Sequence, residues 1–236
     1  MASFEDRCCV VVMCNRYESP TIRQTKIQWH LDKDVAWNGG GVHPRGPGLF
    51  IRGHDRTGLE PVVGRWGLIP HFAKTSDIRY NTNNARSEEL HQKASYRTAW
   101  AQGQRCIIPA ISFDEPCWET GKSVWWQFTR KDHRLWGLAG LWNTWTDHQT
   151  GEIVESYTML TINADEHPLM SRMHKPDPKL PADQQDKRSV VVIEDCDTEQ
   201  WLYGGQTEVT DLIRAPSIEV IHGGPIHLAA QARQLF

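Results

Sequence analysis

The sequence contains no hydrophobic run of the roughly 18 residues needed to cross a bilayer. The most apolar stretch near its start, CCVVVM at residues 8–13, is far shorter and follows two acidic residues, whereas a secretory signal opens with cationic ones. Paired CxxC motifs are missing from the six cysteines, so neither a zinc ribbon nor a regular disulfide framework is expected. These absences predict a cytoplasmic protein, not bound to membranes, whose thiols are reduced and mostly buried.

An excess of positive charge is also missing, since the formal net charge is −3 and the isoelectric point is near 6.4. This balance argues against a broadly basic nucleic-acid-binding surface, although a local basic groove stays open. The glycine-rich segment GGGVHPRG at 39–46 lacks the Lys-Ser/Thr ending of a phosphate-binding loop. His43 and His54 do not have the spacing of a structural zinc site. We therefore expect neither a metal nor a cofactor.

Core-forming residues are abundant, since hydrophobic residues make up 39% of the chain and 11 are tryptophan. This is enough for one large domain. Helical periodicity occurs at 21–37 and 86–102, with shorter helices at 197–203 and near the C-terminus, and 39–48 is expected to be a loop. Runs rich in β-branched and aromatic residues predict strands at 8–13, 48–52, 65–69, 105–113, 124–129, 135–142, 157–162 and 189–194. The pattern favours an α+β class: a compact single domain built on largely antiparallel β-sheet with flanking helices.

Four polar residues stand at the edges of predicted strands, where a sheet can present them to one cleft: Cys14, Asn84, Glu115 and His174. A thiol, an amide, a carboxylate and an imidazole form a workable set for nucleophilic and acid–base chemistry. Each residue also has a purely structural interpretation. Cys14 then is a buried thiol, Asn84 a helix cap, Glu115 an exposed turn residue and His174 a solvated or structurally bonded histidine.

Five motifs follow one another along the chain: MCNRY at 13–17, RWGLIPHF at 65–72, NARSE at 84–88, RCIIPAISFDEP at 105–116 and RMHKPDPKLP at 172–181. Together they resemble the SOS response-associated peptidase family, whose members covalently shield abasic sites in single-stranded DNA. AGLW at 139–142 and YTMLT at 157–161 fit the same pattern. The resemblance implies the compact, largely antiparallel fold, no cofactor, and single-stranded DNA containing abasic sites as the partner.

The resemblance also implies a role for each of the four polar residues. Cys14 would form the covalent bond to DNA. Glu115 would handle protons at the reacting amine, and His174 would assist opening of the sugar ring and act as a general acid. Asn84 would hydrogen-bond the active-site backbone or the sugar.

Further positions are implied as DNA-binding residues. Two arginines, Arg16 and Arg86, would contact phosphates that flank the lesion. Three residues would wall the cleft or stack on a neighbouring base: Pro44, Trp66 and Phe72, although core packing is the favoured role for Trp66. Thr161 would add a hydrogen bond to a phosphate or a sugar.

Several departures from the family pattern leave the activity open. The segment 41–45 keeps only Pro44 of the family's Asn-x-Ala-Pro loop, and in 112–116 Ser112 and Pro116 replace the expected glycine and tryptophan. The Arg-Met-Pro expected after the histidine is missing, although the letters RM stand just before it. Whether these altered loops preserve activity does not follow from the sequence.

The position of the cysteine decides the mechanism. In the family it is residue two and becomes the amino terminus once methionine is removed, whereas 13 residues precede Cys14. A free α-amino group, with a pKa of about 7.7–8.0 against about 10.4 for lysine, can condense with the aldehyde of a ring-opened abasic sugar. The neighbouring thiol then closes a thiazolidine, because proximity makes that step unimolecular. An internal Cys14 offers only an amide nitrogen.

We therefore expect residues 1–13 to be a leader that is removed, by initiation at Met13 or by autoproteolysis with Cys14 as the nucleophile. Residues 14–236 would then form the single domain. A retained leader is the alternative, and it would leave the protein inactive or committed to another reaction.

Two other functions remain open beside an enzyme with thiol autopeptidase and abasic-site crosslinking activity. A cysteine hydrolase using Cys14, His174 and Asn84 would be active with the leader in place and would acylate the thiol. A non-catalytic module would bind nucleic acid or protein without forming a covalent product.

Overall fold

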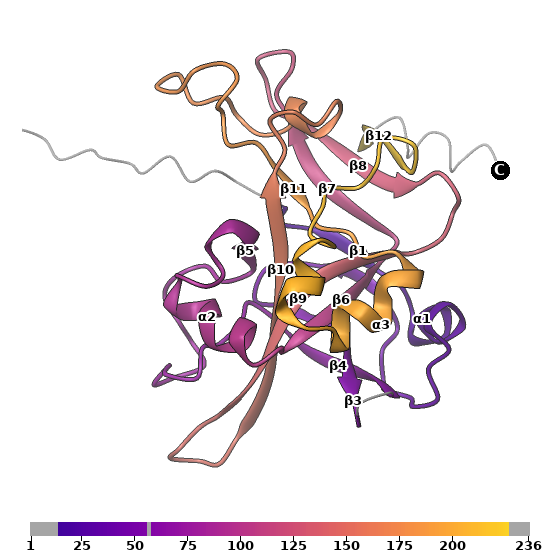
Figure 1. Cartoon of the computed structure of the whole chain (residues 1–236), viewed down its shortest axis with the longest axis vertical. Helices are drawn as coiled ribbons and strands as arrows, with labels where there is room; N and C mark the ends of the chain where they lie inside the picture. Colours follow the sequence, from indigo (N-terminus) through magenta and orange to yellow (C-terminus); the bar gives the residue numbers. More distant parts are fainter. Residues whose placement is uncertain (1–13, 56–57, 227–236) are drawn as a thin grey trace, which may run out of the picture.

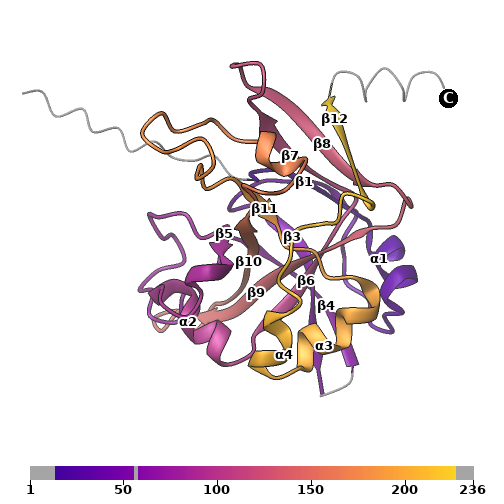
Figure 2. The same ribbon diagram turned by 45° about the horizontal axis from the view of Figure 1, so that its top comes forward.

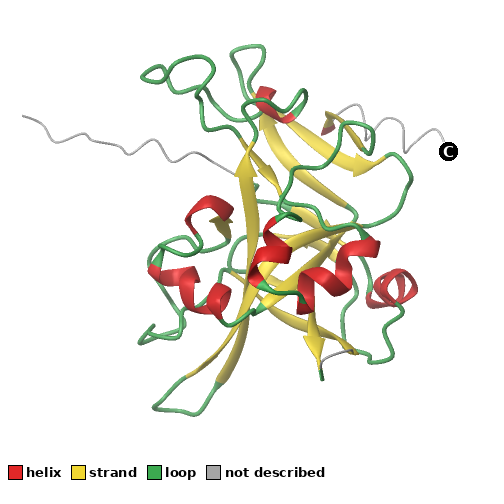
Figure 3. Cartoon of the chain, in the orientation of Figure 1, coloured by secondary structure: helices red, strands yellow, loops and turns green. Residues whose placement is uncertain are grey.

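The computed structural model describes residues 14–55 and 58–226, and these residues form two β-sheets with short helices around them (Figures 1 and 3). The strands are β1 Tyr17–Ser19, β2 Gly40–Val42, β3 Pro47–His54, β4 Gly58–Trp66, β5 Asn84–Arg86, β6 Arg105–Ala110, β7 Ser112–Cys117, β8 Val124–Arg130, β9 Trp136–Thr146, β10 Ile153–Asn163, β11 Arg188–Val190 and β12 Ile221–Pro225. The α-helices are α1 Ile22–Trp29, α2 Ala94–Ala101, α3 Thr198–Tyr203 and α4 Gln206–Thr210, and the 3-10 helices are η1 Ser87–Glu89, η2 Met170–Arg172 and η3 Asp195–Asp197.

The larger sheet closes on itself as a small barrel. Its order is β11-β10-β4-β3-β6-β9, and β9 pairs with β10 as well as with β6. The second sheet has the order β12-β8-β7-β1-β2. Apart from the parallel pairings of β10 with β4 and β5, the neighbouring strands of both sheets are antiparallel. The predicted α+β fold on largely antiparallel sheet with flanking helices is confirmed.

Alternation along the barrel strands builds two cores, because successive side chains of a strand point to opposite faces. Cys106 and Ile108 of β6 belong to the inner cluster, which extends into the second sheet. Ile107, between them, belongs to an outer cluster that α1, α2 and α3 cover. β5 and α2 lie on the opposite side of the long strand β10 from α1, as Figures 1 and 2 show. The barrel is therefore filled inside and covered outside.

Several predicted elements need correction. The expected strand at 105–113 is two strands, because Ile111 leaves the barrel and donates its N–H to the carbonyl of Glu18 (2.7 Å) in the second sheet. The segment 39–48, expected to be a loop, contains β2 and the start of β3. The helix expected over 21–37 ends at Trp29, where His30 adopts a left-handed conformation. Over 86–102 only Ala94–Ala101 is α-helical. The expected strand at 8–13 lies outside the described residues.

No helix among the residues that the structure describes is long and apolar enough to span a membrane. The helices are short because much of the buried surface comes from strands. α2, for example, buries Tyr96, Ala99 and Trp100 along a single face. Such a helix is stabilised mainly by packing against the sheet and little by its own propensity.

Gly48 tests how tightly the inner core is packed. It lies beside the hydroxyl groups of Tyr17 and Tyr157, which hydrogen-bond to each other at 2.5 Å in the buried interior, and a Cβ at this position would overlap both oxygens. We expect Gly48→Ala to destabilise the fold by about 1–3 kcal/mol, the usual cost of overpacking. Thermal unfolding measures this as a melting temperature lower by roughly 2–4 °C per kcal/mol.

Gly224→Ala is the matched control, because Gly224 also lies in a strand but has no atom within 4 Å of the position of an added Cβ. Equal melting temperatures for the two variants would contradict the tight packing around Gly48.

Candidate active site

The pairing of β1 with β7 brings Cys14 to Glu115. Tyr17 lies opposite Phe113, and the strands run antiparallel, so the residues before Tyr17 run beside the residues after Phe113. The N–H of Asp114 donates to the carbonyl of Arg16 (3.0 Å). One step further, the backbone N–H of Cys14 donates to the carboxylate of Glu115. The nitrogen that would be the α-amine of a chain beginning at Cys14 therefore faces a carboxylate.

His174 completes a buried pair with Glu115. Its Nε2 lies 2.9 Å from Oε2 of Glu115, and each side chain is only 2% exposed. The Nδ1 of His174 accepts the backbone N–H of Arg188 (3.5 Å), so Nε2 carries the proton and donates to the carboxylate. The pair can therefore pass a proton between a ring nitrogen and a carboxylate next to Cys14.

The backbone of His174 is held in an unusual conformation. Its φ is 62°, in the left-handed region that non-glycine residues rarely adopt. The N–H donates to the carbonyl of Pro116 (2.7 Å), and the carbonyl accepts the ammonium of Lys187 (2.6 Å). Lys187 is itself buried, and burial lowers its pKa. These contacts fix the direction of the imidazole towards Glu115.

Asn84 holds the other side of Cys14. It begins β5, which pairs in parallel with β10, and its Nδ2 donates to the carbonyl of Cys14 (2.8 Å). Its own carbonyl accepts the hydroxyl of Tyr96 (3.0 Å). The Oδ1 of Asn84 is buried without a hydrogen-bond partner among the described residues. The amide thus positions the Cys14 backbone and keeps one acceptor available.

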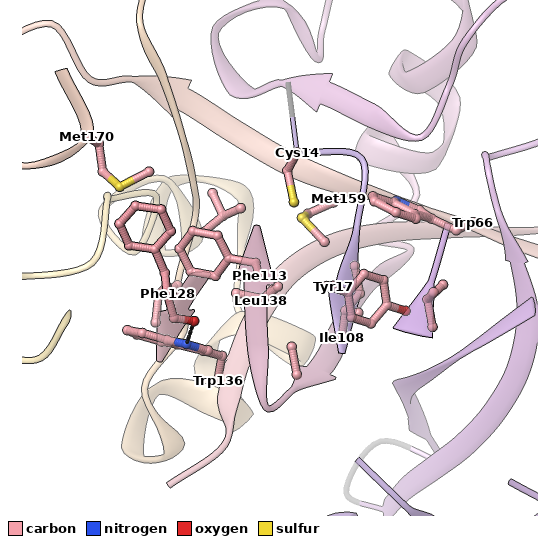
Figure 4. Close-up of a cluster of buried hydrophobic side chains, with 14 of the residues drawn as sticks. Cys14, Tyr17, Trp66, Ile108, Phe113, Phe128, Trp136, Leu138, Met159 and Met170 are labelled. Atoms are coloured by element: carbon pink, nitrogen blue, oxygen red, sulfur yellow. Dashed lines mark hydrogen bonds between the residues drawn. The ribbon is translucent and has the colours of Figure 1, made fainter. Parts of the chain in front are cut away.

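The thiol of Cys14 is fully buried, and Figure 4 shows its sulfur directed towards Met159 in the inner core. Burial raises its pKa well above the usual value, and the negative charge of Glu115 raises it further. Burial also raises the pKa of Glu115, against the opposing effect of His174. At neutral pH the sulfur is therefore a protonated thiol, donating weakly to the carbonyl of Arg16 (3.5 Å).

The structure brings Cys14, Asn84, Glu115 and His174 together, as the sequence predicted, whereas the predicted DNA-binding residues are placed differently. Trp66 is fully buried and its indole N–H donates to the carbonyl of Asn83 (2.8 Å). It is a core residue, the role that the sequence favoured for it, and its ring offers no surface to a base in this structure.

Thr161 is also interior, being 2% exposed, with its hydroxyl 3.5 Å from the carbonyl of Ala85 and 3.4 Å from Nη2 of Arg188. It offers no hydroxyl to a phosphate on the surface. Phe72 is 49% exposed and Pro44 is partly exposed, so both remain available at the surface.

The two predicted phosphate-binding arginines already have carboxylate partners. Arg16 forms ion pairs with the buried Asp114 and, at 3.4 Å, with Glu18. Arg86 forms one with Asp186 at 2.6 Å. Both arginines are partly exposed, so a phosphate would have to exchange with these carboxylates.

Three residues at the site were missed from the sequence: Asp114, Lys187 and Arg188. Arg188 stands beside the His174 ring, although the loop 175–187 separates the two in sequence. The RM letters before His174 were the wrong place to look, because Arg172 points elsewhere, pairing with Glu119 and covering the ring of Trp126. The available signal was KRSVVV at 187–192, in which a cationic pair stands directly before the strand predicted at 189–194.

In the described part of the chain, no group of three or more His, Cys, Asp or Glu side chains is placed to hold an ion. The imidazole and carboxylate of the His174–Glu115 pair are hydrogen-bonded to each other. The site offers a thiol, a buried acid–base pair and an amide.

Curated relatives have names that refer to abasic sites. The abasic site processing protein YobE of Bacillus subtilis is 36% identical over 147 residues, which are 61% of this chain and 59% of the relative. The abasic site processing protein HMCES of Gallus gallus is 30% identical over 154 residues, which are 53% of this chain and 45% of the relative. The chain thus matches about half of the length of these relatives.

Solved structures support the fold over nearly the whole chain. A crystal structure of a protein from Bordetella bronchiseptica matches with a TM-score of 0.78 and 34% identity, covering 90% of this chain and 99% of the other. A protein from Bacteroides thetaiotaomicron matches with a TM-score of 0.76, covering 90% and 91%, but at 21% identity it is evidence for the fold alone. The family model described as SOS response associated peptidase matches residues 13–226, and the chain therefore belongs to the SOS response-associated peptidase family.

Proposed function

We propose that this protein processes abasic sites in single-stranded DNA by forming a covalent thiazolidine crosslink through Cys14, once the residues before it have been removed. The observation that carries the proposal is the hydrogen bond from the backbone nitrogen of Cys14 to the Glu115 carboxylate. The names of the curated relatives point to the same substrate. No cofactor is required, and the thiol needs a reducing compartment such as the cytoplasm.

The covalent reaction follows from the groups around Cys14. The α-amine adds to the aldehyde carbon of the ring-opened sugar, and Glu115 takes the proton that the amine loses while the aldehyde oxygen gains one from the Glu115–His174 pair and becomes a hydroxyl. Loss of the hydroxyl as water, with a proton supplied by the Glu115–His174 pair, gives an imine. The thiol of Cys14 then adds to the imine carbon while its proton goes to the nitrogen, closing a five-membered ring. One water is released overall.

Ring closure requires the Cys14 side chain to turn, because its sulfur is fully buried in the inner cluster. The high pKa of the thiol is no obstacle, since the step transfers both the sulfur and its proton to the imine. Asn84 holds the carbonyl of Cys14 during this rotation, so the amine stays at Glu115 while the sulfur moves.

The residues before Cys14 would be removed by the same thiol. Attack of the sulfur on the carbonyl of residue 13 shifts the acyl group from nitrogen to sulfur and frees the α-amine. Hydrolysis of the resulting thioester by water releases the leader as an acid and restores the thiol. Glu115, which accepts the Cys14 N–H, is placed to exchange the proton on that nitrogen. Initiation at Met13 would supply the same mature chain without this step.

A thiolate-dependent hydrolase is the less favoured alternative. Such enzymes activate the sulfur with an adjacent base and a lowered pKa, whereas the pKa of Cys14 is raised and Nε2 of His174 donates to Glu115. A non-catalytic binding module would leave the buried acid–base pair without a use.

Denaturing gel electrophoresis tests the proposal directly. Incubation with a single-stranded oligonucleotide that carries one abasic site is expected to give a band that survives denaturation, with an intact mass equal to protein plus DNA minus one water. The same oligonucleotide without the abasic site is the control. A complex that is visible only in native gels would replace the proposal with non-covalent binding.

A further inference from the structure

A cleft of about 480 Å³ lies behind His174, between the end of β7 and the loop 175–187. Its volume falls within the range of about 300–1,000 Å³ that is typical of small-ligand sites. The residues that matter for its chemistry are Trp118, Arg172, Leu180, Gln185 and Lys187. None of the roles assigned above uses this space.

The cleft shares its wall with the active site. The carbonyl of Pro116, next to Glu115, accepts the His174 N–H, and two residues later the N–H of Trp118 donates to the carbonyl of Arg172 (3.2 Å). Lys187, which lines the cleft, binds the carbonyl of His174 at 2.6 Å. Only the backbone of Pro116 and His174 would therefore separate a group in the cleft from the Glu115–His174 pair.

The cleft combines an aromatic face with charges of both signs: Arg172 and Lys187 line it together with Glu119 and Asp177. Lys175 is outside the lining and reaches the cleft only at the ring of Trp118. Trp118 is only partly buried, and the ammonium of Lys175 lies 5.6 Å from the centre of its ring. Arg172 adds a second cation, whose Nε is buried without a hydrogen-bond partner among the described residues. Its guanidinium is paired with Glu119, so a phosphate would have to exchange with that carboxylate. An aromatic ring flanked by cations suits a nucleotide, because the base stacks on the ring and the phosphate meets the charges.

The loop that forms the far wall is held rigid. Pro176, Pro178 and Pro181 restrict its backbone. The side chain of Gln185 accepts the N–H of Asp177 (2.7 Å) and donates to the carbonyls of Leu180 (3.0 Å) and Pro181 (2.8 Å). A wall fixed before binding reduces the entropy that a ligand must overcome.

We propose that this cleft holds the nucleotide next to the abasic sugar, with its base stacked on Trp118 and its phosphate near Lys175 and Arg172. The inference rests on the proposed function, since it needs a DNA strand at Cys14. It assigns one flank of the lesion to the loop 175–187, in which the sequence analysis gave no residue a DNA-binding role.

Non-covalent binding tests the cleft without depending on the covalent reaction. Three fluorescent oligonucleotides carry a stable tetrahydrofuran analogue of the abasic site, in the middle, at the 5′ end or at the 3′ end. We expect Trp118→Ala to weaken binding of the first about tenfold, the usual scale for loss of one base stack. Of the two oligonucleotides with the analogue at an end, the variant should bind one about as weakly and the other as tightly as the parent does. The second lacks the nucleotide that would occupy the cleft.

Trp125→Ala is the matched control. Trp125 is a tryptophan of the same hairpin, 42% exposed in β8, and it does not line the cleft. Its substitution is expected to leave the affinity for all three oligonucleotides unchanged. Equal losses in the two variants, or equal losses on both end-labelled oligonucleotides, would overturn the assignment.

Lys175→Gln gives a second measurement that leaves the tryptophan in place. Loss of one phosphate contact should lower the slope of log affinity against log salt by about one on the same two oligonucleotides. An unchanged slope would contradict the proposed contact between the phosphate and Lys175. If Cys14 forms the crosslink but Trp118→Ala binds as the parent does, the cleft proposal fails alone; if no crosslink forms, these affinities still decide it.

Discussion

Cys14→Ser, in a chain that begins at residue 14, is expected to abolish the crosslink that survives denaturation while leaving the first half of the reaction intact. The variant keeps the α-amine beside Glu115, where the Cys14 nitrogen lies, so the imine still forms. A hydroxyl is a much weaker nucleophile towards an imine than a thiol, and the ring does not close. We expect the stable adduct to fall by more than about 100-fold, a loss on the scale of an intramolecular nucleophile.

Borohydride reduction separates the two steps. It converts an imine to a stable amine, so the Cys14→Ser chain should give a denaturation-resistant band only when borohydride is present. Cys196→Ser is the matched control, since Cys196 is the exposed free cysteine of the described chain and lies away from the site. Its crosslink should equal that of the parent chain.

Crosslink formation should depend strictly on whether Cys14 is the amino-terminal residue. Chains shown by intact mass to retain residues 1–13 are expected to form no crosslink, because their Cys14 nitrogen is an amide. A crosslink from such chains, with or without borohydride, would rule out the terminal amine as the reacting group.

Much of the site was predictable because its residues lie in short motifs that recur at strand ends. Cys14 and Glu115 meet because β1 and β7 are antiparallel neighbours. The sequence predicted a strand before Glu115, at 105–113, but not β1, which follows Cys14. The fold class was predictable for a similar reason: runs of β-branched and aromatic residues mark strands even when their pairing is unknown.

What the sequence could not predict was set by contacts between distant segments. Arg188 reaches the His174 ring only because the loop 175–187 folds back on itself. The break at Ile111 depends on a hydrogen bond to Glu18, which no local pattern announces. The burial of Trp66 is different, because core packing was the role that the sequence favoured for this residue.

Glu115→Gln is expected to separate chemistry from stability. Glutamine has nearly the same shape, and its Oε1 can still accept the proton on Nε2 of His174, which lies 2.9 Å from the glutamate oxygen. It cannot take a proton from the amine. We therefore expect the rate of crosslink formation to fall by about 10²- to 10⁴-fold, the usual contribution of a positioned acid–base group.

The pH dependence follows from the direction of the pKa shift. Burial raises the pKa of Glu115, and only the ionised carboxylate, present above that pKa, can take the proton. The parent rate should therefore rise with pH through this raised pKa, and rise again as the terminal amine loses its proton near its ordinary pKa of about 7.7–8.0. Glu115→Gln should keep only the second rise. A variant that keeps both would show that another group supplies the base.

The stability of the fold should fall with rising pH over the range in which the rate of crosslink formation rises. A carboxyl group whose pKa is higher in the folded than in the unfolded chain stabilises the fold at low pH, and that stabilisation is lost as pH rises through the folded pKa. Above that pH the buried charge of Glu115 opposes folding, and Glu115→Gln removes it. The melting temperature of the variant at neutral pH should thus equal or exceed that of the parent. A clearly lower melting temperature would mean that the buried His174–Glu115 hydrogen bond, 2.9 Å long, stabilises the fold more than desolvation of the carboxylate destabilises it. The loss of rate in Glu115→Gln would then reflect lost stability as well as lost catalysis.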